Sequence, residues 1–243
     1  MRILIIRHAD PDYTHDTLTE KGWREAELLA NRLEKEKIDY FYSSPLGRAK
    51  DTCKTVAKRF GKEKDIVVHD WLREFDARPH VPCNDRPTRA WDILPQFWTD
   101  RDLLYDSKRW HQEEYFKKVQ TEEKYQAVGE GLKNLLASHG YVRENGRYRV
   151  ENANSDTIAL FCHFGIEMMI LSLMLGVSPI PLLHGFVALP SSVTTLYSEE
   201  RREGVGFFRC CEFGSLTHLY IGNEPPSFAA RFCERFIDET RHD

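Results

Sequence analysis

The amino-acid sequence predicts an α/β fold of three layers, in which helices cover both faces of a mostly parallel central sheet. Short apolar runs alternate with amphipathic stretches in the order strand, helix, strand, helix, strand, and this order returns late in the chain. Two of the apolar runs end directly before a histidine, His8 and His163. Because ligands bind at the carboxyl edge of such sheets, the two histidines are expected to meet in one site. Arg7 beside His8 indicates an anionic ligand.

The first half of the chain contains five predicted elements. They are a strand at residues 3–6, a helix after an N-cap at Thr19, a strand at 38–42, a helix at 46–60 and a strand at 66–68. Apolar residues in the first helix recur every three or four positions, which is the spacing of a helix with one buried face. The hydroxyl of Thr19 can accept a hydrogen bond from a free N–H group in the first turn.

The second half predicts a similar core followed by a tail. We expect a helix at 125–138, a strand at 157–161, a helix at 164–175, strands at 193–197, 206–211 and 216–221, and a terminal amphipathic helix at 228–237. Residues 77–124 carry many aromatic side chains, and Trp91, Leu94 and Trp98 recur at helical spacing. We interpret 77–124 as a partly helical insertion or lid over the active-site edge of a single domain, residues 1–243.

Charge and composition exclude several classes of protein. The formal net charge is −4, so a basic nucleic-acid surface is not expected. No apolar run reaches the roughly 20 residues that span a bilayer, and no signal peptide is recognised, so we expect a cytoplasmic protein with no membrane partner. The six cysteines form no C-x-x-C pair, and no His, Asp or Glu spacing predicts a metal centre. We therefore expect neither metal nor cofactor; the oligomeric state is left open.

Four motifs, each after a predicted strand, carry the chemical information. They are Arg7-His8, residues 43–52 (Ser-Ser-Pro-Leu-Gly-Arg-Ala-x-x-Thr), residues 72–75 (Leu-Arg-Glu-Phe) and residues 163–165 (His-Phe-Gly). Together and in this order they resemble the histidine phosphatase superfamily, which includes the cofactor-dependent phosphoglycerate mutases. The resemblance implies a phosphoglycerate mutase-like fold, a phosphatase activity and a small phosphorylated metabolite as the partner.

His8 is the expected nucleophile. A neutral imidazole has an ordinary pKa of about 6.5 and can attack phosphorus at neutral pH without a separate base, which would give a phosphohistidine. Arg7 and Arg48 are expected to bind the phosphoryl oxygens, because guanidinium groups match phosphate geometry. The resemblance implies that His163 is the second imidazole on the phosphate, either charged or donating a hydrogen bond.

The general acid and the remaining substrate contacts are each assigned with an alternative. Glu74 is the expected general acid, and this role requires that burial raises its pKa. Asp76 is the alternative, and Asp10 and Asp12 are lesser candidates. Phe164 stands where the family usually has glycine, so its ring is expected either to narrow the pocket or to stack on a substrate, while its N–H group adds an anion-binding donor. The Trp-Asn phosphate contact of the mutases is missing, and Tyr13 or Thr14 is expected to replace it.

Three functions are compatible with these residues. The first is hydrolysis of a small phosphomonoester through phosphohistidine. The second is phosphoryl transfer of the phosphoglycerate mutase type, which is disfavoured because Asp10 stands where many mutases carry glutamate. The third is binding of a phosphorylated ligand without turnover. The sequence does not rank sugar phosphates, phosphorylated cofactor precursors and nucleotides as substrates.

Overall fold

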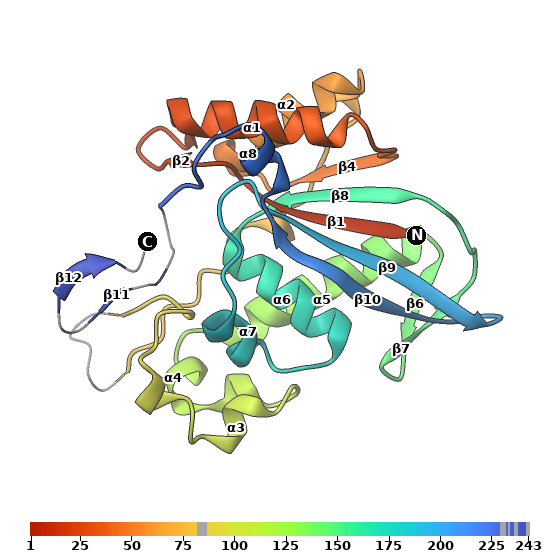
Figure 1. The fold of residues 1–243 in the computed structure, drawn as a ribbon. Helices are drawn as coiled ribbons and strands as arrows, with labels where there is room; N and C mark the ends of the chain where they lie inside the picture. Colours follow the sequence, from red (N-terminus) through yellow and green to blue (C-terminus); the bar gives the residue numbers. More distant parts are fainter. Residues whose placement is uncertain (82–86, 229–231, 233, 236–237, 242–243) are drawn as a thin grey trace.

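A computed structural model describes residues 1–81, 87–228, 232, 234–235 and 238–241 of the chain. Its centre is an eight-stranded sheet with helices on both faces (Figure 1). From one edge to the other, the strands are β5 (Val67–Val68), β4 (Tyr40–Ser43), β8 (Thr157–Cys162), β1 (Arg2–Arg7), β9 (Val193–Arg202), β10 (Val205–Ser215), β7 (Arg147–Val150) and β6 (Tyr141–Glu144). The predicted α/β class and its three layers are confirmed.

The sheet is more mixed than the sequence indicated. Strands β5, β4, β8 and β1 pair in parallel, whereas β9, β10, β7 and β6 continue the sheet in antiparallel pairs. Two of these antiparallel pairs, β6 with β7 and β9 with β10, join strands that are consecutive along the chain. Tight turns can join antiparallel strands, whereas parallel strands need a long crossover. Asn145 and Gly146, both at positive φ (49° and 80°), form such a turn between β6 and β7, and Gly204 at φ 74° helps to form another.

Two helix layers enclose separate apolar cores. Helices α1 (Glu20–Leu33) and α2 (Gly47–Arg59) cover one face of the sheet, and α5 (Thr121–Ser138) and α6 (Phe164–Leu175) cover the other (Figure 1). Successive side chains of β1 alternate between the two cores: Leu4 and Ile6 pack toward α1 and α2, and Ile3 and Ile5 pack toward α5 and α6. Strand β1 is therefore buried on both faces, as its unbroken apolar run predicted.

The remaining elements are short. They are β2 (Pro11–Asp12), β3 (Thr17–Leu18), α3 (Asp102–Tyr105), α4 (Glu114–Lys117), α7 (Pro179–Gly185), α8 (Thr217–Ile221), β11 (Glu234–Arg235), β12 (Asp238–Arg241), and 3₁₀ turns at Glu63–Asp65, Asp70–Leu72, Pro95–Phe97 and Trp110–Gln112. Within the described ranges, no helix combines the length and apolarity needed to cross a membrane.

Three predicted elements differ from the structure. Residues 216–221 were expected to form a strand but contain helix α8, where consecutive residues His218 and Leu219 are buried while Tyr220 and Ile221 are exposed. The terminal helix predicted at 228–237 is wrong at Glu234–Arg235, which form β11; residues 229–231, 233 and 236–237 lie outside the described residues.

The insertion 77–124 contains α3, α4 and 3₁₀ turns, but no helix runs through Trp91, Leu94 and Trp98. Pro95 is the reason, because a proline restricts the preceding residue to extended conformations, and Leu94 is extended at ψ 143°. The later part of the insertion packs on α5 through Trp110, which is fully buried and lies 5.2 Å from Tyr125 between ring centroids.

A tight contact fixes the start of α2. The Asp16 carboxylate accepts a hydrogen bond from the Gly47 N–H group at 2.7 Å and so caps a helix whose own N-cap, Leu46, has no side chain able to do so. The backbone carbonyl of Asp16 lies so close that a Cβ added at Gly47 would be 1.8 Å from its oxygen. Only glycine therefore fits at this position.

We expect Gly47→Ala to lower the free energy of unfolding by about 2 kcal/mol, because the backbone at Asp16 must move and the cap is lost. Chemical denaturation of the purified variant measures this change. Gly185→Ala is the matched control, since a Cβ at Gly185 has nothing within 4 Å. Equal unfolding midpoints for the two variants would show that the contact is not tight.

Candidate active site

The two predicted histidines lie side by side at the carboxyl ends of β1 and β8. The strands pair in parallel with Arg7 opposite Cys162, so His8 and His163, one residue further along each chain segment, occupy equivalent positions. Their ring centroids are 5.0 Å apart, and both side chains are buried. The expectation that the histidines meet at one edge of the sheet is confirmed.

The hydrogen bonds of His8 define its tautomer. Nδ1 lies 2.8 Å from the Ala9 carbonyl oxygen, which can only accept, so Nδ1 carries the proton and Nε2 carries the lone pair. Arg48 Nε donates to that lone pair at 3.3 Å. Burial, with the nearby charges of Arg7 and Arg48, holds the pKa of His8 well below its ordinary value of 6.5. His8 is therefore neutral, and Nε2 is the ring nitrogen with nucleophilic character, although Arg48 engages its lone pair in this structure.

The two arginines near His8 have different partners. Arg7 is buried and donates through Nη1 to the Ala188 carbonyl at 2.5 Å, and its Nε has no hydrogen-bond partner among the described residues. Arg48 Nη1 pairs with Asp16 Oδ1 at 2.7 Å. A cation in the first turn of a helix is unfavourable beside the helix dipole, and Asp16 is the anion that offsets it. Both arginines retain N–H groups for a phosphate.

His163 depends on a residue that the sequence analysis did not single out. Ser44 Oγ lies 2.8 Å from His163 Nε2, while His163 Nδ1 is buried without a partner among the described residues. Burial, with the charges of Arg48 and Arg7, holds the pKa of His163 well below 6.5, so a neutral ring that donates a hydrogen bond fits better than a charged one. Ser44 follows β4, which pairs with β8, and its place in the motif at residues 43–52, directly after a predicted strand, was the only signal in the sequence.

Glu74 and Asp76 have different environments. Burial raises the pKa of Glu74 above its ordinary 4.5, against the opposing effects of Arg7 and of the Phe75 and Ile166 N–H groups, which donate to Oε1 at 2.8 and 3.2 Å. Asp76 is exposed and its Oδ1 accepts from two arginines, Arg78 at 2.8 Å and Arg89 at 3.1 Å. The geometry favours Glu74 as the group that holds a proton.

Arg7, Arg48, Glu74 and Asp76 line one cavity of about 680 Å³, whereas the buried His8 and His163 are not among its lining residues. Its lining includes Arg7, Tyr13, Arg48, Glu74 and Phe164 from the predicted site, together with Leu46, Arg73, Asp76, Arg89, Trp91, Asp92 and Phe232. The described residues of the lining do not include Thr14, whose N–H group donates to Asp12 Oδ1 at 2.9 Å. Tyr13 is placed to contact a ligand beside Arg48, whose guanidinium carbon lies 5.3 Å from its ring centroid.

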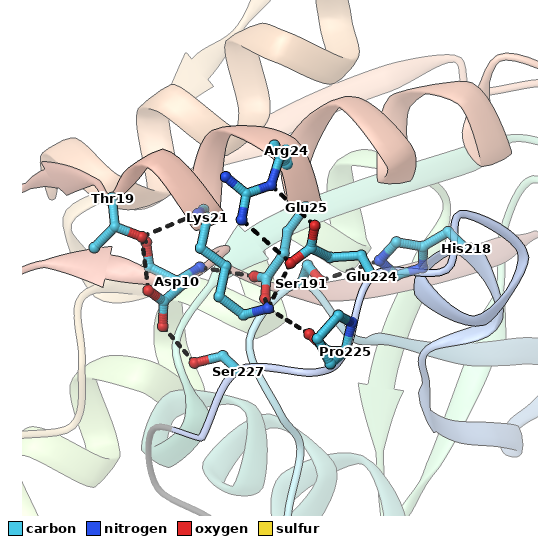
Figure 2. A network of polar contacts seen from close by, with 11 residues as sticks. Asp10, Thr19, Lys21, Arg24, Glu25, Ser191, His218, Glu224, Pro225 and Ser227 are labelled. Carbon is cyan, nitrogen blue, oxygen red and sulfur yellow. Dashed lines mark hydrogen bonds and ion pairs between the residues drawn. The ribbon is translucent and has the colours of Figure 1, made fainter.

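A polar network holds Asp10, in the loop that follows His8 (Figure 2). The buried Glu25 accepts from the Asp10 N–H group at 2.9 Å, and the Asp10 carboxylate accepts from Thr19 at 2.6 Å and from Ser227. Burial raises the pKa of Glu25 to about 7. The network commits the Asp10 side chain to a structural position and keeps the backbone beside His8 in place.

A second contact supports His8 through its carbonyl. The Ser191 N–H group donates to the His8 carbonyl at 3.0 Å, and Ser191 Oγ lies 3.0 Å from His218 Nε2. Ser191 has a φ of 60°, which is unfavourable for a residue other than glycine. The hydrogen bond to buried His218, drawn in Figure 2, helps to hold Ser191 in this conformation.

Comparison with known proteins identifies the family. The sequence profile of the histidine phosphatase superfamily (branch 1) matches residues 3–207. The chain belongs to this superfamily. The resemblance of its four strand-end motifs is thereby confirmed, and His8, Arg48, Glu74 and His163 all lie within the matched residues.

Solved structures of this superfamily share the fold. A phosphoserine phosphatase from Entamoeba histolytica, solved with phosphoserine, has a TM-score of 0.58 at 18% identity, and the likeness covers 90% of this chain and 98% of that one. A mycobacterial glucosyl-3-phosphoglycerate phosphatase has a TM-score of 0.57 at 19% identity, with 88% and 99% covered. At these identities the likeness concerns the fold.

Curated relatives match over a shorter stretch. A 2,3-bisphosphoglycerate-dependent phosphoglycerate mutase of Thermoplasma acidophilum is 39% identical over 82 residues, 30% of this chain and 40% of its own length. Phosphoserine phosphatase 1 of Hydrogenobacter thermophilus is 29% identical over 85 residues, 31% of this chain and 39% of its own length. The chain thus spans about two fifths of the length of these relatives.

The opposite pKa shifts of Glu74 and His8 predict the pH dependence of kcat/KM. A proton donor works only while protonated, so activity on an alkyl phosphate falls as pH rises through the raised pKa of Glu74. The lowered pKa of His8 keeps the nucleophile neutral at mildly acidic pH. Glu74→Gln should therefore lose about 100-fold in kcat/KM and the alkaline limb with it, as steady-state profiles would measure.

p-Nitrophenyl phosphate is the matched substrate for this prediction, because its leaving group departs without protonation, and Glu74→Gln should affect it far less. Asp76→Asn is the matched variant and should keep the wild-type profile. Loss of the alkaline limb in Asp76→Asn instead would transfer the role to Asp76.

Proposed function

We propose that this protein is a phosphatase that hydrolyses a small phosphomonoester through a phosphohistidine on His8. The observation that carries the proposal is the position of the His8 ring, whose Nδ1 lies 2.8 Å from the Ala9 carbonyl oxygen and whose Nε2 lies 3.3 Å from Arg48 Nε, with the His163 ring beside it. The family membership and the naming of several fold relatives as phosphatases support it.

In the first step, the His8 Nε2 lone pair forms a bond to phosphorus and the bond from phosphorus to the ester oxygen breaks. Glu74 gives its proton to the departing oxygen, which leaves as an alcohol. Arg7 and Arg48 stabilise the charge on the phosphoryl oxygens, and His163 donates a hydrogen bond to one of them.

In the second step, water attacks phosphorus and the N–P bond breaks. The ionised Glu74 accepts the proton of that water, which returns the enzyme to its starting state and releases phosphate. Arg7, Arg48 and the imidazoles supply the charge and the nucleophile that the two steps require, so we infer that the reaction proceeds without a metal or cofactor. Residues 1–243 would act as one domain, with the insertion 77–124 supplying part of the wall around the leaving group.

Phosphoryl transfer of the mutase type is the second candidate. A mutase must shield phosphohistidine from water until the phosphoryl group returns. The cavity does not favour such shielding, because Tyr13 in its wall is 67% exposed. Asp10, at the position of the mutase glutamate, is engaged by Thr19 and Ser227 rather than by the cavity. Hydrolysis therefore fits this site better.

The test is hydrolysis of p-nitrophenyl phosphate with and without EDTA. His8→Ala should lower kcat at least about 1,000-fold, because the nucleophile is removed, and Arg48→Ala should lower it about 100-fold. EDTA should leave the wild-type rate unchanged. His80→Ala is the matched control, since His80 is exposed and outside the cavity lining.

Mass spectrometry of protein trapped during turnover should place one phosphate on His8. Wild-type turnover in His8→Ala would overturn the proposal. A phosphorylated His8 that reacts with glycerates but not with water would favour the mutase, and binding of phosphomonoesters without turnover of any would favour a non-catalytic ligand-binding role.

A further inference from the structure

We propose that the outer part of this cavity is a stacking subsite for a planar, aromatic leaving group, with Trp91 as its specificity-determining residue. The inference rests on the proposed phosphatase function and names the class of substrate. It is carried by the way aromatic and cationic side chains alternate along the cavity wall.

A continuous series of ring contacts leads away from the phosphate-binding end. The Arg7 guanidinium carbon lies 5.9 Å from the centroid of Phe164, the Phe164 and Trp91 centroids are 5.6 Å apart at 90°, and the Arg89 guanidinium carbon lies 5.7 Å from Trp91. All four residues line the cavity. A phosphate at Arg7 therefore places its ester group against the aromatic part of the wall.

The indole of Trp91 is held in position before any substrate binds. Its ring comes so close to the start of α6 that a Cβ at Gly165 would lie 2.5 Å from Trp91 Cζ3 and 2.7 Å from Glu74 Oε1. Glycine at 165 thus lets the indole and the proton donor pack against the same backbone. Asp76 fixes Arg89, which lies over the indole. A rigid aromatic surface beside Glu74 is a preformed binding surface for the departing group.

The mouth of the cavity has further aromatic surface that nothing in the described residues covers fully. Tyr13 is 67% exposed and Phe232 is 40% exposed, and both line the cavity. Removing apolar ring surface from water is favourable, so a ligand that covers these rings gains affinity. A flat ring matches this arrangement better than a small polar chain, because offset and edge-to-face contacts with aromatic side chains add to burial.

The experiment compares three phosphomonoesters of primary alcohols: ethyl, cyclohexylmethyl and benzyl phosphate. The alcohols are similarly poor leaving groups, so differences in kcat/KM report on contacts with the wall. We expect benzyl phosphate to exceed ethyl phosphate about tenfold or more, and to exceed cyclohexylmethyl phosphate, which is apolar but not flat.

Trp91→Ala should remove most of this preference, because kcat/KM for benzyl phosphate falls toward the value that the same variant shows for ethyl phosphate. Trp98→Ala is the matched control, because Trp98 lies in the same insertion but stacks on His184, at 4.9 Å, and does not line the cavity among its described residues. The variants' thermal unfolding is measured alongside. Should Trp91→Ala unfold, competitive inhibition of the wild type by benzylphosphonate and methylphosphonate gives the same comparison.

The outcomes separate the two proposals. Equal kcat/KM values for ethyl and benzyl phosphate, or a preference that survives Trp91→Ala, would overturn the subsite while leaving the phosphatase intact. A cyclohexylmethyl preference equal to that for benzyl would replace stacking by simple apolar burial and overturn it as well. Tighter inhibition by benzylphosphonate without hydrolysis of any ester would support the subsite and defeat the phosphatase.

Discussion

The parallel register between β1 and β8 determines where the two histidines of the candidate site lie. Six consecutive pairs, from Arg2 opposite Thr157 to Arg7 opposite Cys162, bring the two strands to an end at the same level. His8 and His163 follow at that level, and the carboxyl end of β4 adds Ser44 beside them. A slip of one residue would turn each side chain to the opposite face. The alternating burial of β1 between two cores makes such a slip unfavourable, so the packing of the interior also aligns the site.

Burial of the site separates the pKa values of its acids and bases. Desolvation disfavours every charged form, which raises the pKa of Glu74 and lowers that of His8 and His163. The two guanidiniums oppose the shift of the acid but reinforce the shift of both imidazoles. The shifts favour the protonated form of the carboxyl and the neutral form of both imidazoles, the combination expected of a proton donor beside a nucleophile.

Glu167, in helix α6, affects how much of the positive charge of Arg7 is neutralised. Its carboxyl is buried, accepts from Thr194 Oγ1 at 2.6 Å, and has a pKa raised by burial to about 8. At neutral pH it is largely protonated, and so it does not neutralise Arg7. The positive charge of Arg7 therefore remains available to a phosphate, although a carboxyl lies nearby.

The sequence predicted those strands and site residues whose positions are determined by a few consecutive residues. Apolar runs identified β1 and β8, and the residues directly after them identified His8 and His163. The antiparallel half of the sheet is also signalled locally, because Asn145-Gly146 is a typical sequence for a tight turn between two such strands. Asp16 beside Gly47, Ser44 beside His163 and Trp91 beside Gly165 are contacts between distant segments, which no spacing along the chain specifies. The positions of the two histidines were thus predictable from strand ends, whereas the residues that orient them and line the outer part of the cavity depend on how the insertion and loops fold onto the sheet.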